Sequence, residues 1–439
     1  MGLENVGGLA MAVVLSKLEP RDAASVSCLN RRFHFWAADE RLWSHFCFQE
    51  LRLSSPIDHQ GNPSPSFKAA YRAWREGFSM YPWPLVVRVK TCWDNLKECL
   101  SVNFPEILPT LRRGASEDDI REFQQSLEVK LPLPARILYR FFDGQDMPKQ
   151  KFNGSSPPVG LLGIMGGYSF YDHEVNVYLL PLSHVIAVTK YFKSHLTFME
   201  ISSYIAVAAT STYRDKLFFL NCETGRMFVG SGNFCELLPC VPEASVGSAD
   251  SQQKDEDGML LWVEEHASRL QNGSIRVRQK GSIRSLSLFP ERPPLCSIST
   301  TNGVTVRASA VFVPEISNLQ DEEEYMFSYS IRMSLAPSGC VVDGVNCSSC
   351  QLYWRHWTIR GDDGNVVYNV NGEAVIGQYP LLRSGEEEFV YESCTYLDTS
   401  EGSIEGHFTF VPGNLMEPMG SPFEVEVSRF PLKVPDYIF

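Results

Sequence analysis

The chain has 439 residues, of which 44% are hydrophobic and 21% are charged, and its formal net charge is -13. This length predicts roughly two to four domains at about 100 to 200 residues per domain, and the composition is typical of a folded globular protein. The acidic balance argues against nucleic-acid binding as the main activity, because contacts with phosphates need an excess of Lys and Arg. We interpret the basic stretch 275–284 as a solvated segment between domains.

No stretch of the sequence approaches the roughly 18 to 20 consecutive apolar residues of a membrane span. The longest candidate, "VGGLAMAVVL" at 6–15, has no basic region before it, as an export signal would. The 12 cysteines are scattered and indicate reduced thiols. We therefore expect a soluble protein of the cytoplasm or nucleus with no membrane partner.

The first 50 or so residues show short helical patterns. Val13, Val14 and Leu18 predict one apolar helix face that ends before a proline, and a second helix is expected to start after Asp22. Residues Val26, Leu29, Phe33 and Trp36 would lie on one side of that second helix. A module this small is marginal alone, so a partner is implied.

The stretch "LAMAVVLSKLEPRDAASVSCLNRRFHFWAADERLW" resembles an F-box, the module that binds the Skp-type adaptor of a cullin-based ubiquitin ligase. The family's usual Leu-Pro at the start is Leu9-Ala10 here. An ordinary helical hairpin packed on the next domain remains the alternative. By this resemblance the adaptor-binding residues are Leu9, Val14, Leu15, Leu18, Pro20, Val26, Leu29, Phe33, Leu42 and Trp43.

The following segment, 51–105, predicts a helical linker region. Phe67, Tyr71 and Trp74 recur at helical spacing, which is more typical of a packed core than of a cofactor site. Further on, Ser116 with Asp119 forms a capping-box pattern, and Ile120, Phe123 and Leu127 supply the apolar face of the helix that follows.

The order helix, Leu-Pro, helix, Gly after Ser116 is similar to the Smi/Knr (SUKH) family, an α+β module that binds proteins. The hairpin "KLFFLNCETGRMFVG", with its turn at 223–225, and the helix "GMLLWVEEHASRL" fit the same resemblance. We place this module at 106–272, with a disordered acidic insertion near 243–257, and a connector at 273–296.

From residue 297 the hydrophobic period changes to two. In "EYMFSYSIRM" alternate residues from Tyr325 to Met333 predict a half-buried antiparallel strand, and "FEVEVSRF" repeats the pattern with Phe423, Val425 and Val427 inward. Further strands of this kind separated by turns predict a β-sandwich. The residues "WRHWTIRGDDGNV" and "GEAVIGQYPLLRSGEEEFVYESC" resemble the ApaG domain, whose fold is fibronectin III-like, over 297–439.

The stretch "NVNGEAVIG" at 369–377 almost matches the G-x-G-x-x-G pattern of a pyrophosphate loop, with Ala374 in place of the middle glycine. That motif needs a helix directly after the loop, whereas the turn-forming Gln378-Tyr379-Pro380 follows here. We therefore interpret Gly372 and Gly377 as strand and turn residues. A phosphate- or nucleotide-binding sensor, or a scaffold, that uses this loop is the alternative function.

Other constellations give weak signals for chemistry. Asp172-His173-Glu174 lacks a nucleophile motif, and a surface or hydrogen-bonded histidine is expected. Cys347 and Cys350, with Cys340 and His356, do not form the two well-spaced pairs of a structural zinc site. We predict no catalytic residues, no metal and no cofactor.

The order of modules therefore predicts a multidomain chain with an all-α F-box at 1–50, an α+β SUKH-like module and an all-β ApaG sandwich. This order resembles plant Skp-interacting F-box proteins that carry a C-terminal ApaG domain and, more distantly, animal F-box-only proteins of the same order. The resemblance implies a non-catalytic substrate receptor of an SCF-type ubiquitin ligase, with an unknown protein substrate and with cullin and RING subunits reached through the adaptor. Candidate substrate-binding residues are Trp354, Trp357 and Tyr379, which are equally candidates for the core.

Overall fold

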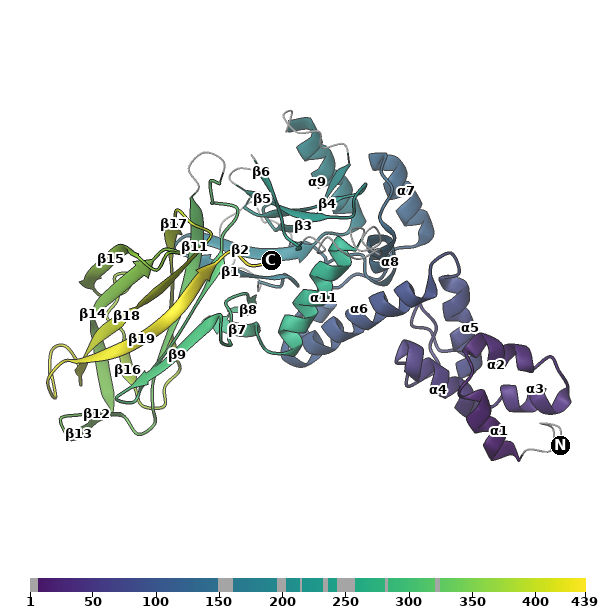
Figure 1. The fold of residues 1–439 in the computed structure, drawn as a ribbon, viewed down its shortest axis with the longest axis horizontal. Coiled ribbons are helices and arrows are strands. Elements are labelled where there is room, and N and C mark those ends of the chain that lie inside the picture. The colour runs from purple at the N-terminus through teal and green to yellow at the C-terminus, as the bar shows by residue number, and fades with distance from the viewer. Residues whose placement is uncertain are drawn as a thin grey trace. The chain divides into compact units, whose positions relative to one another are not determined.

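The computed structural model describes residues 7–148, 161–195, 203–213, 215–231, 236–242, 257–280, 283–319 and 324–439. It divides into two compact units, Met1–Asn95 and Leu96–Phe439. The acidic insertion expected near 243–257 lies outside the described residues except for Asp257. Each unit is described by itself, and Figure 1 labels the helices and strands.

The first unit is helical. It contains α1 (Gly8–Leu15), α2 (Pro20–Val26), α3 (Arg31–Ala37), α4 (Glu40–Leu51), α5 (Phe67–Gly77) and the first part of α6 (Trp83–Asn103). The helix expected to carry Val26, Leu29, Phe33 and Trp36 on one face is two helices, which corrects that prediction. The physical reason is Asn30, whose side chain accepts hydrogen bonds from the backbone N–H groups of Arg32 and Phe33 and so starts α3 anew.

The apolar face of α1 also differs from the expectation. Met11 and Leu15, one helical turn apart, are the buried pair, whereas Val13 and Val14 are exposed. The next helix begins at Pro20, before Asp22, because proline is well suited to the first turn of a helix.

The segment 51–105 was expected as a linker, but its residues 51–95 complete the core of the first unit. Helix α4 packs against α5, and the rings of Trp43 and Tyr71 lie 5.6 Å apart. The Glu50 carboxylate accepts hydrogen bonds from the Tyr71 hydroxyl at 2.8 Å and from the Trp83 indole at 2.7 Å. Part of the partner that the short N-terminal segment requires is therefore this chain's own α5 and α6.

The second unit begins with η2 (Pro105–Thr110), α7 (Glu117–Leu127) and α8 (Leu133–Phe141). Helix α7 has the expected capping box between Ser116 and Asp119. A mixed sheet follows in the order β6-β5-β4-β3-β2-β1-β8-β7, with α9 (Leu182–His195) on β3 and α11 (Gly258–Gln271) on β5 and α8. Its strands are β1 (Gly166–Phe170), β2 (His173–Leu179), β3 (Tyr204–Thr210), β4 (Leu217–Asn221), β5 (Met227–Ser231), β6 (Glu236–Pro239), β7 (Arg276–Lys280) and β8 (Ile283–Ser287).

The segment 273–296, expected as a connector, supplies two of these strands. β7 and β8 form an antiparallel hairpin, and β8 pairs with β1 in parallel through Gly167 and Ser287. The basic stretch 275–284 is therefore largely an edge of the sheet and not only a link between domains.

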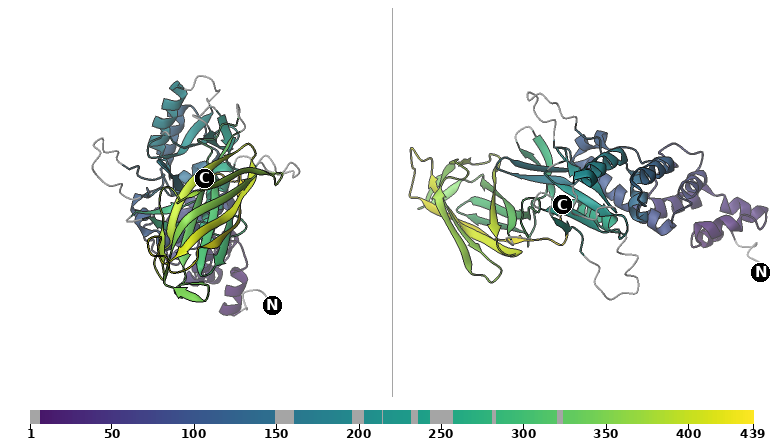
Figure 2. Two further views of the ribbon diagram at one scale, coloured as in Figure 1. Left: turned by 90° about the vertical axis from the view of Figure 1, so that its left-hand side faces the viewer. Right: turned by 90° about the horizontal axis from the view of Figure 1, so that it is seen from above.

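The C-terminal part is a β-sandwich, whose two layers are visible in Figure 2. One sheet has the order β17-β11-β10-β9, and the other has the order β15-β14-β18-β19 with β16 paired to β14; β12 and β13 form a separate hairpin. The strands are β9 (Cys296–Thr301), β10 (Val304–Phe312), β11 (Tyr325–Leu335), β12 (Cys340–Val342), β13 (Val345–Cys347), β14 (Ser349–Arg360), β15 (Val366–Glu373), β16 (Leu381–Arg383), β17 (Phe389–Leu397), β18 (Glu401–Pro412) and β19 (Phe423–Lys433).

Strand β19 confirms the predicted alternation, with Phe423, Val425 and Val427 buried and the glutamates between them exposed. Strand β11 does not, because it is buried on both faces almost throughout. Arg332 on β11 is only 5% exposed and donates to both carboxylate oxygens of Glu291 at 2.8 and 2.7 Å. The face of β11 that was expected to meet solvent instead packs against the preceding sheet, through β1.

Candidate functional site

Two parts of the molecule are candidate functional sites: the outer surface of the N-terminal helices and a pocket in the sandwich. Five of the predicted adaptor-binding residues are buried within the first unit: Leu15, Pro20, Phe33, Leu42 and Trp43. They hold the helices together. The Trp43 indole, for example, donates a hydrogen bond to the Ala37 carbonyl at 2.7 Å, which ties the start of α4 to the end of α3.

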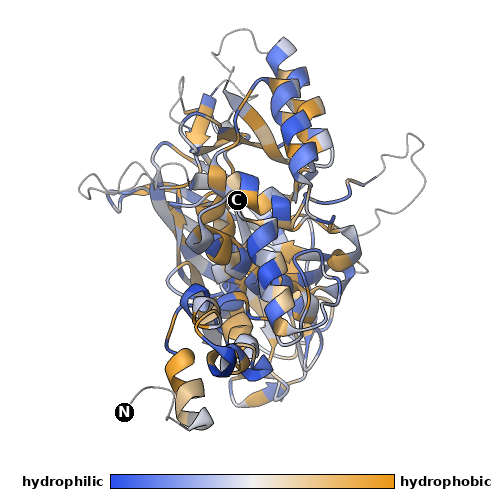
Figure 3. Cartoon of the chain, turned by 90° about the vertical axis from the view of Figure 1, so that its right-hand side faces the viewer, coloured by the Kyte–Doolittle hydropathy of each residue, from blue (hydrophilic) through white to orange (hydrophobic). Residues whose placement is uncertain are grey.

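Other predicted adaptor-binding residues do reach the surface. Val14 is 46% exposed and Leu29 is 69% exposed, while Leu18 and Val26 are half-buried. Leu9 lies within α1, which Figure 3 colours as largely apolar.

The sequence patterns missed the most exposed aromatic side chain of this region. Phe35 on α3 is 76% exposed, and Val13 on α1 is 60% exposed. Helix α3 contacts both α1 and α2. Val13 and the predicted Val14 lie on α1, Phe35 lies on α3, and the predicted Leu29 lies in the turn that joins α2 to α3. We call Val13, Val14, Leu29 and Phe35 the apolar surface of the first unit. Several exposed apolar side chains on adjoining segments favour a surface that binds another protein.

Glu50 and Tyr71 join α4, the helix that follows α3, to α5. The pKa of Tyr71 is raised by burial and by its hydrogen bond to Glu50, so the phenol stays protonated and remains a donor. This polar contact fixes α4 on α5 through groups that cannot turn toward solvent without losing their partners.

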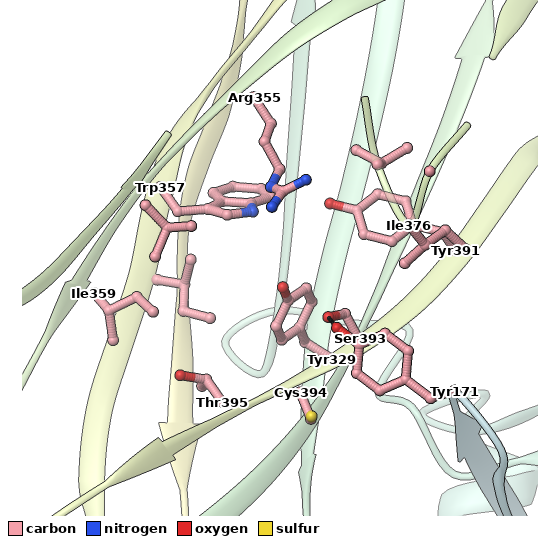
Figure 4. Close-up of a pocket in the computed structure, with 14 residues that line it drawn as sticks. Tyr171, Tyr329, Arg355, Trp357, Ile359, Ile376, Tyr391, Ser393, Cys394 and Thr395 are labelled. Atoms are coloured by element: carbon pink, nitrogen blue, oxygen red, sulfur yellow. Dashed lines mark hydrogen bonds between the residues drawn. The ribbon is translucent and has the colours of Figure 1, made fainter. Parts of the chain in front are cut away.

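The second site is a pocket of 320 Å³ in the sandwich (Figure 4). Arg355, Trp357 and Ile359 point into it because they alternate along β14 and share one face of that strand. Tyr391 and Ser393 enter from β17, on the other sheet, and Tyr171 enters from the turn between β1 and β2. The Tyr171 hydroxyl lies 3.0 Å from the Ser393 hydroxyl.

The three predicted substrate-binding residues have different surroundings. Trp357 is 4% exposed and lines the pocket, whereas Trp354 is half-buried and Tyr379 is 39% exposed. The Tyr379 hydroxyl donates to Glu373 at 2.7 Å. The structure therefore places only Trp357 in the pocket. Arg355 and Tyr391 were missed, although an arginine two residues before a buried tryptophan on one strand is a signal that the sequence contains.

The loop with the near-match to a pyrophosphate motif forms part of the wall of this pocket, through Val375, Ile376 and Gly377. Its backbone N–H groups are partly used within the protein: Ala374 donates to Tyr353, Val375 to Gln378 and Gln378 to Val375. The next regular element is the short strand β16 and not a helix. A loop of this kind lacks the converging free N–H groups that bind pyrophosphate at a helix N-terminus.

The remaining motifs have structural partners. The His173 ring lies 3.0 Å from the Glu315 carboxylate, which is the hydrogen-bonded histidine expected from the sequence. Cys340, Cys347 and Cys350 are buried. Among the described residues, no group of His, Cys, Asp and Glu is placed to hold a metal ion, and no helix is both long and apolar enough to cross a bilayer.

Comparison with known proteins identifies the family. The chain is 56% identical over 446 residues to the F-box protein SKIP16 of Arabidopsis thaliana, and the match covers 100% of both chains. The chain belongs to this family of F-box proteins. A family model described as the ApaG domain matches residues 316–412, within the sandwich.

Two more distant relatives match different shares of this chain. Human F-box only protein 3 is 24% identical to this F-box protein over 446 residues, which cover 99% of this chain and 84% of the human one. The Protein ApaG of Xylella fastidiosa (strain M12) is 36% identical over 132 residues, covering 30% of this chain and 91% of that protein. The family assignment therefore concerns the whole chain, and the sandwich has bacterial relatives that consist of little else.

Proposed function

We propose that this F-box protein is the substrate-recognition subunit of an SCF-type ubiquitin ligase. In this function, the first unit binds a Skp-type adaptor, and the adaptor connects the chain to the cullin and RING subunits. The second unit, with its SUKH-like part and its sandwich, binds the target protein. The chain itself performs no catalysis and holds no cofactor, and it acts in the cytoplasm or nucleus. Its contribution is to raise the effective concentration of the target beside the transferring enzyme.

The observation that carries this proposal is the apolar surface of the first unit in a chain whose relatives are F-box proteins along its full length. The buried residues Leu15, Phe33 and Trp43 keep the helices in place, and the exposed residues Leu29 and Phe35 are the direct contacts with the adaptor. Burying two such side chains in a partner contributes roughly 1.5 to 3 kcal/mol each. A small number of well-buried apolar anchors is sufficient for a specific interface.

A phosphate-binding sensor has less support. The loop at 374–378 uses several of its N–H groups internally and is followed by a strand.

The test is assembly of the complete ligase from purified parts. The full chain is mixed with a cullin and a RING subunit, once with a Skp-type adaptor and once without it. Both mixtures are analysed by gel filtration. We expect co-elution of all components only when the adaptor is present. Point variants are preferable to deletion of residues 1–50, because such a deletion would remove Glu50 and expose Tyr71 and Trp83. Co-elution with the adaptor but not with the cullin would instead indicate a scaffold that delivers no substrate.

A further inference from the structure

The floor of the sandwich pocket contains two buried polar groups that lack partners. The exposed fractions of Trp357 and Tyr391 are 4% and 3%. In the described part of the protein, neither the Trp357 indole nitrogen nor the Tyr391 hydroxyl forms a hydrogen bond of good geometry, although the indole N–H lies close enough to the phenol oxygen to lower the pKa of Tyr391 slightly against the effect of burial. Leaving a buried donor without an acceptor costs about 1 to 3 kcal/mol, so native proteins rarely keep such groups without a ligand or a water molecule to satisfy them.

These two groups lie close to one positively charged side chain, that of Arg355. Figure 4 shows the polar ends of Arg355, Trp357 and Tyr391 directed toward one another inside the pocket. One guanidinium nitrogen of Arg355 donates to the Ala374 carbonyl at 2.9 Å. This bond orients the side chain and leaves further donors of the guanidinium unused. Within the described ranges, the residues that line the pocket include no Asp or Glu, and Arg355 is the one charged side chain among them.

The protonation states suit an acceptor ligand. The pKa of the Tyr391 phenol is raised well above its usual value, chiefly by burial, and the neighbouring Trp357 N–H does not reverse this shift. The phenol therefore remains a neutral donor at physiological pH, and the indole can only donate. Three donors, one of them charged, face a space with no competing anion.

The rest of the pocket is apolar and small. Ile359, Val375 and Ile404 are at most 5% exposed and form its inner walls, while Tyr171 and Ile376 are exposed and mark its rim. The volume of 320 Å³ is at the lower end of the range for ligand pockets, about 300 to 1,000 Å³, and suits a group of side-chain size. One guanidinium balances the single charge of a carboxylate, whereas a phosphate dianion would need more positive charge.

We propose that this pocket binds a carboxylate carried on an apolar group, with the carboxylate on Arg355, Trp357 and Tyr391 and the apolar group against the aliphatic wall. A side chain or chain terminus of a target protein provides this chemistry, and in that case the inference rests on the proposed function. A free small carboxylic acid provides the same chemistry.

The rim of the pocket connects it to the preceding sheet. Tyr171 has a positive φ of 47° and contacts Ser393, so the β1–β2 turn contributes to a pocket that is otherwise formed by the sandwich. Non-glycine residues in this conformation are uncommon and are maintained by surrounding contacts. The pocket is therefore a property of the assembled second unit.

In the experiment, the full chain is titrated with hydrocinnamate and with its neutral amide. Binding is measured by calorimetry and by the Trp357 indole N–H signal in NMR spectra. A second arm uses a short peptide that ends in phenylalanine, as the free acid and as the C-terminal amide. Inorganic phosphate is titrated in a third arm. Arg355→Met and Tyr391→Phe remove binding groups, and Arg383→Met is the matched control, since Arg383 is an exposed arginine of the same sandwich outside the pocket.

We expect at least one of the acids to bind, the corresponding amide not to bind, and the Trp357 signal to shift. Affinity should fall about tenfold or more in Arg355→Met and about three- to tenfold in Tyr391→Phe, and should be unchanged in Arg383→Met. Tyr391→Phe keeps the test decisive if Arg355→Met fails to fold after losing its bond to Ala374. Binding of hydrocinnamate alone identifies a free small acid as the ligand, and tighter binding of the peptide acid identifies a protein chain.

Equal binding of acid and amide, no saturable binding of either acid at millimolar concentration, or binding of phosphate alone would overturn the proposal. Adaptor binding is measured on the same samples. An intact adaptor complex without acid binding would refute only the pocket assignment, whereas acid binding without an adaptor complex would refute only the proposed function.

Discussion

Lys216 and Glu315 form an ion pair between the mixed sheet and the sandwich, with 3.7 Å between the ammonium nitrogen and the carboxylate oxygen. The side chains are 0% and 3% exposed. Lys216 also donates to the Phe439 carbonyl at 2.6 Å, and Glu315 accepts from the Tyr168 hydroxyl at 2.7 Å. Burial lowers the pKa of Lys216. Burial alone would raise the pKa of Glu315, but Lys216, His173 and Tyr168 outweigh it and hold this pKa below its usual value.

This cluster predicts a large loss of stability in Lys216→Met. The substitution leaves the Glu315 carboxylate buried without its cation, and breaking a buried pair in this way costs about 3 to 5 kcal/mol. The urea midpoint of the second unit, followed by tryptophan fluorescence, measures the effect. The double variant Lys216→Met/Glu315→Gln should lose less than Lys216→Met, because no uncompensated charge remains. A Lys216→Met variant as stable as the wild type would show that the ion pair does not hold the mixed sheet and the sandwich together.

His266 predicts a pH dependence of stability. Burial lowers the pKa of His266 from 6.5 to about 4, and its ring nitrogen Nε2 lies 2.8 Å from the Ile164 carbonyl, to which a neutral imidazole donates. Because the unfolded chain binds a proton at a higher pH than the folded chain, this group destabilises the fold as the pH falls from about 6.5 to about 4. The accumulated loss is roughly 3 kcal/mol.

The comparison of wild type with His266→Gln isolates this contribution, since glutamine keeps a donor but does not titrate. Thermal unfolding between pH 7 and pH 4 should show a shallower decline for the variant. Parallel curves for the two proteins would mean that His266 is protonated in the folded chain or that another group dominates.

The first unit predicts that stability and adaptor binding can be separated. Trp43 is 3% exposed, so Trp43→Ala should destabilise the unit by about 3 to 5 kcal/mol. Leu29 is 69% exposed, so Leu29→Asp should change the free energy of unfolding by about 0.5 kcal/mol or less. Chemical denaturation monitored by circular dichroism checks both values. Unfolding of the unit by Leu29→Asp would place Leu29 in the core and not on a binding surface.

The backbone conformation of the loop at 374–378 leads us to expect a gain in stability when glycine is restored at position 374. Ala374 has a φ of 64°, a conformation that costs a non-glycine residue about 1 to 2 kcal/mol, while glycine costs about 0.5 to 1 kcal/mol in chain entropy. Ala374→Gly should therefore stabilise the sandwich by up to about 1 kcal/mol in thermal unfolding. Calorimetry should detect no pyrophosphate binding before or after the change. Pyrophosphate binding gained by the variant would revive the phosphate hypothesis.

The sequence predicts those elements whose two faces have different neighbours. Strand β19 alternates because one face meets the core and the other meets solvent, and helix α7 begins where Ser116 and Asp119 can cap it. Strand β11 defeats the same argument because its second face is covered by β1, which lies more than a hundred residues earlier in the chain. No local pattern reports such a contact.

The sites are less accessible to prediction for the same reason. The division between α2 and α3 depends on a cap by Asn30 that competes with a continuous apolar spacing, and this division leaves Leu29 exposed. The pocket combines Tyr171, Arg355 and Tyr391 from three segments. The sequence suggested Trp357 as a candidate, but it could not show that the indole nitrogen would lack a partner.

The measurement that tests the central claim most directly is the binding isotherm of the purified full chain with a purified Skp-type adaptor. The wild type is compared with Leu29→Asp/Phe35→Asp and with Val341→Asp, which places one negative charge on an exposed apolar residue of the sandwich. We predict a stoichiometric complex for the wild type and for Val341→Asp, and a loss of affinity of at least about 100-fold for the double variant at unchanged stability, as expected for central interface residues. Equal affinity of all three proteins, or no complex with the wild type, would contradict the assignment of the first unit as the adaptor-binding module.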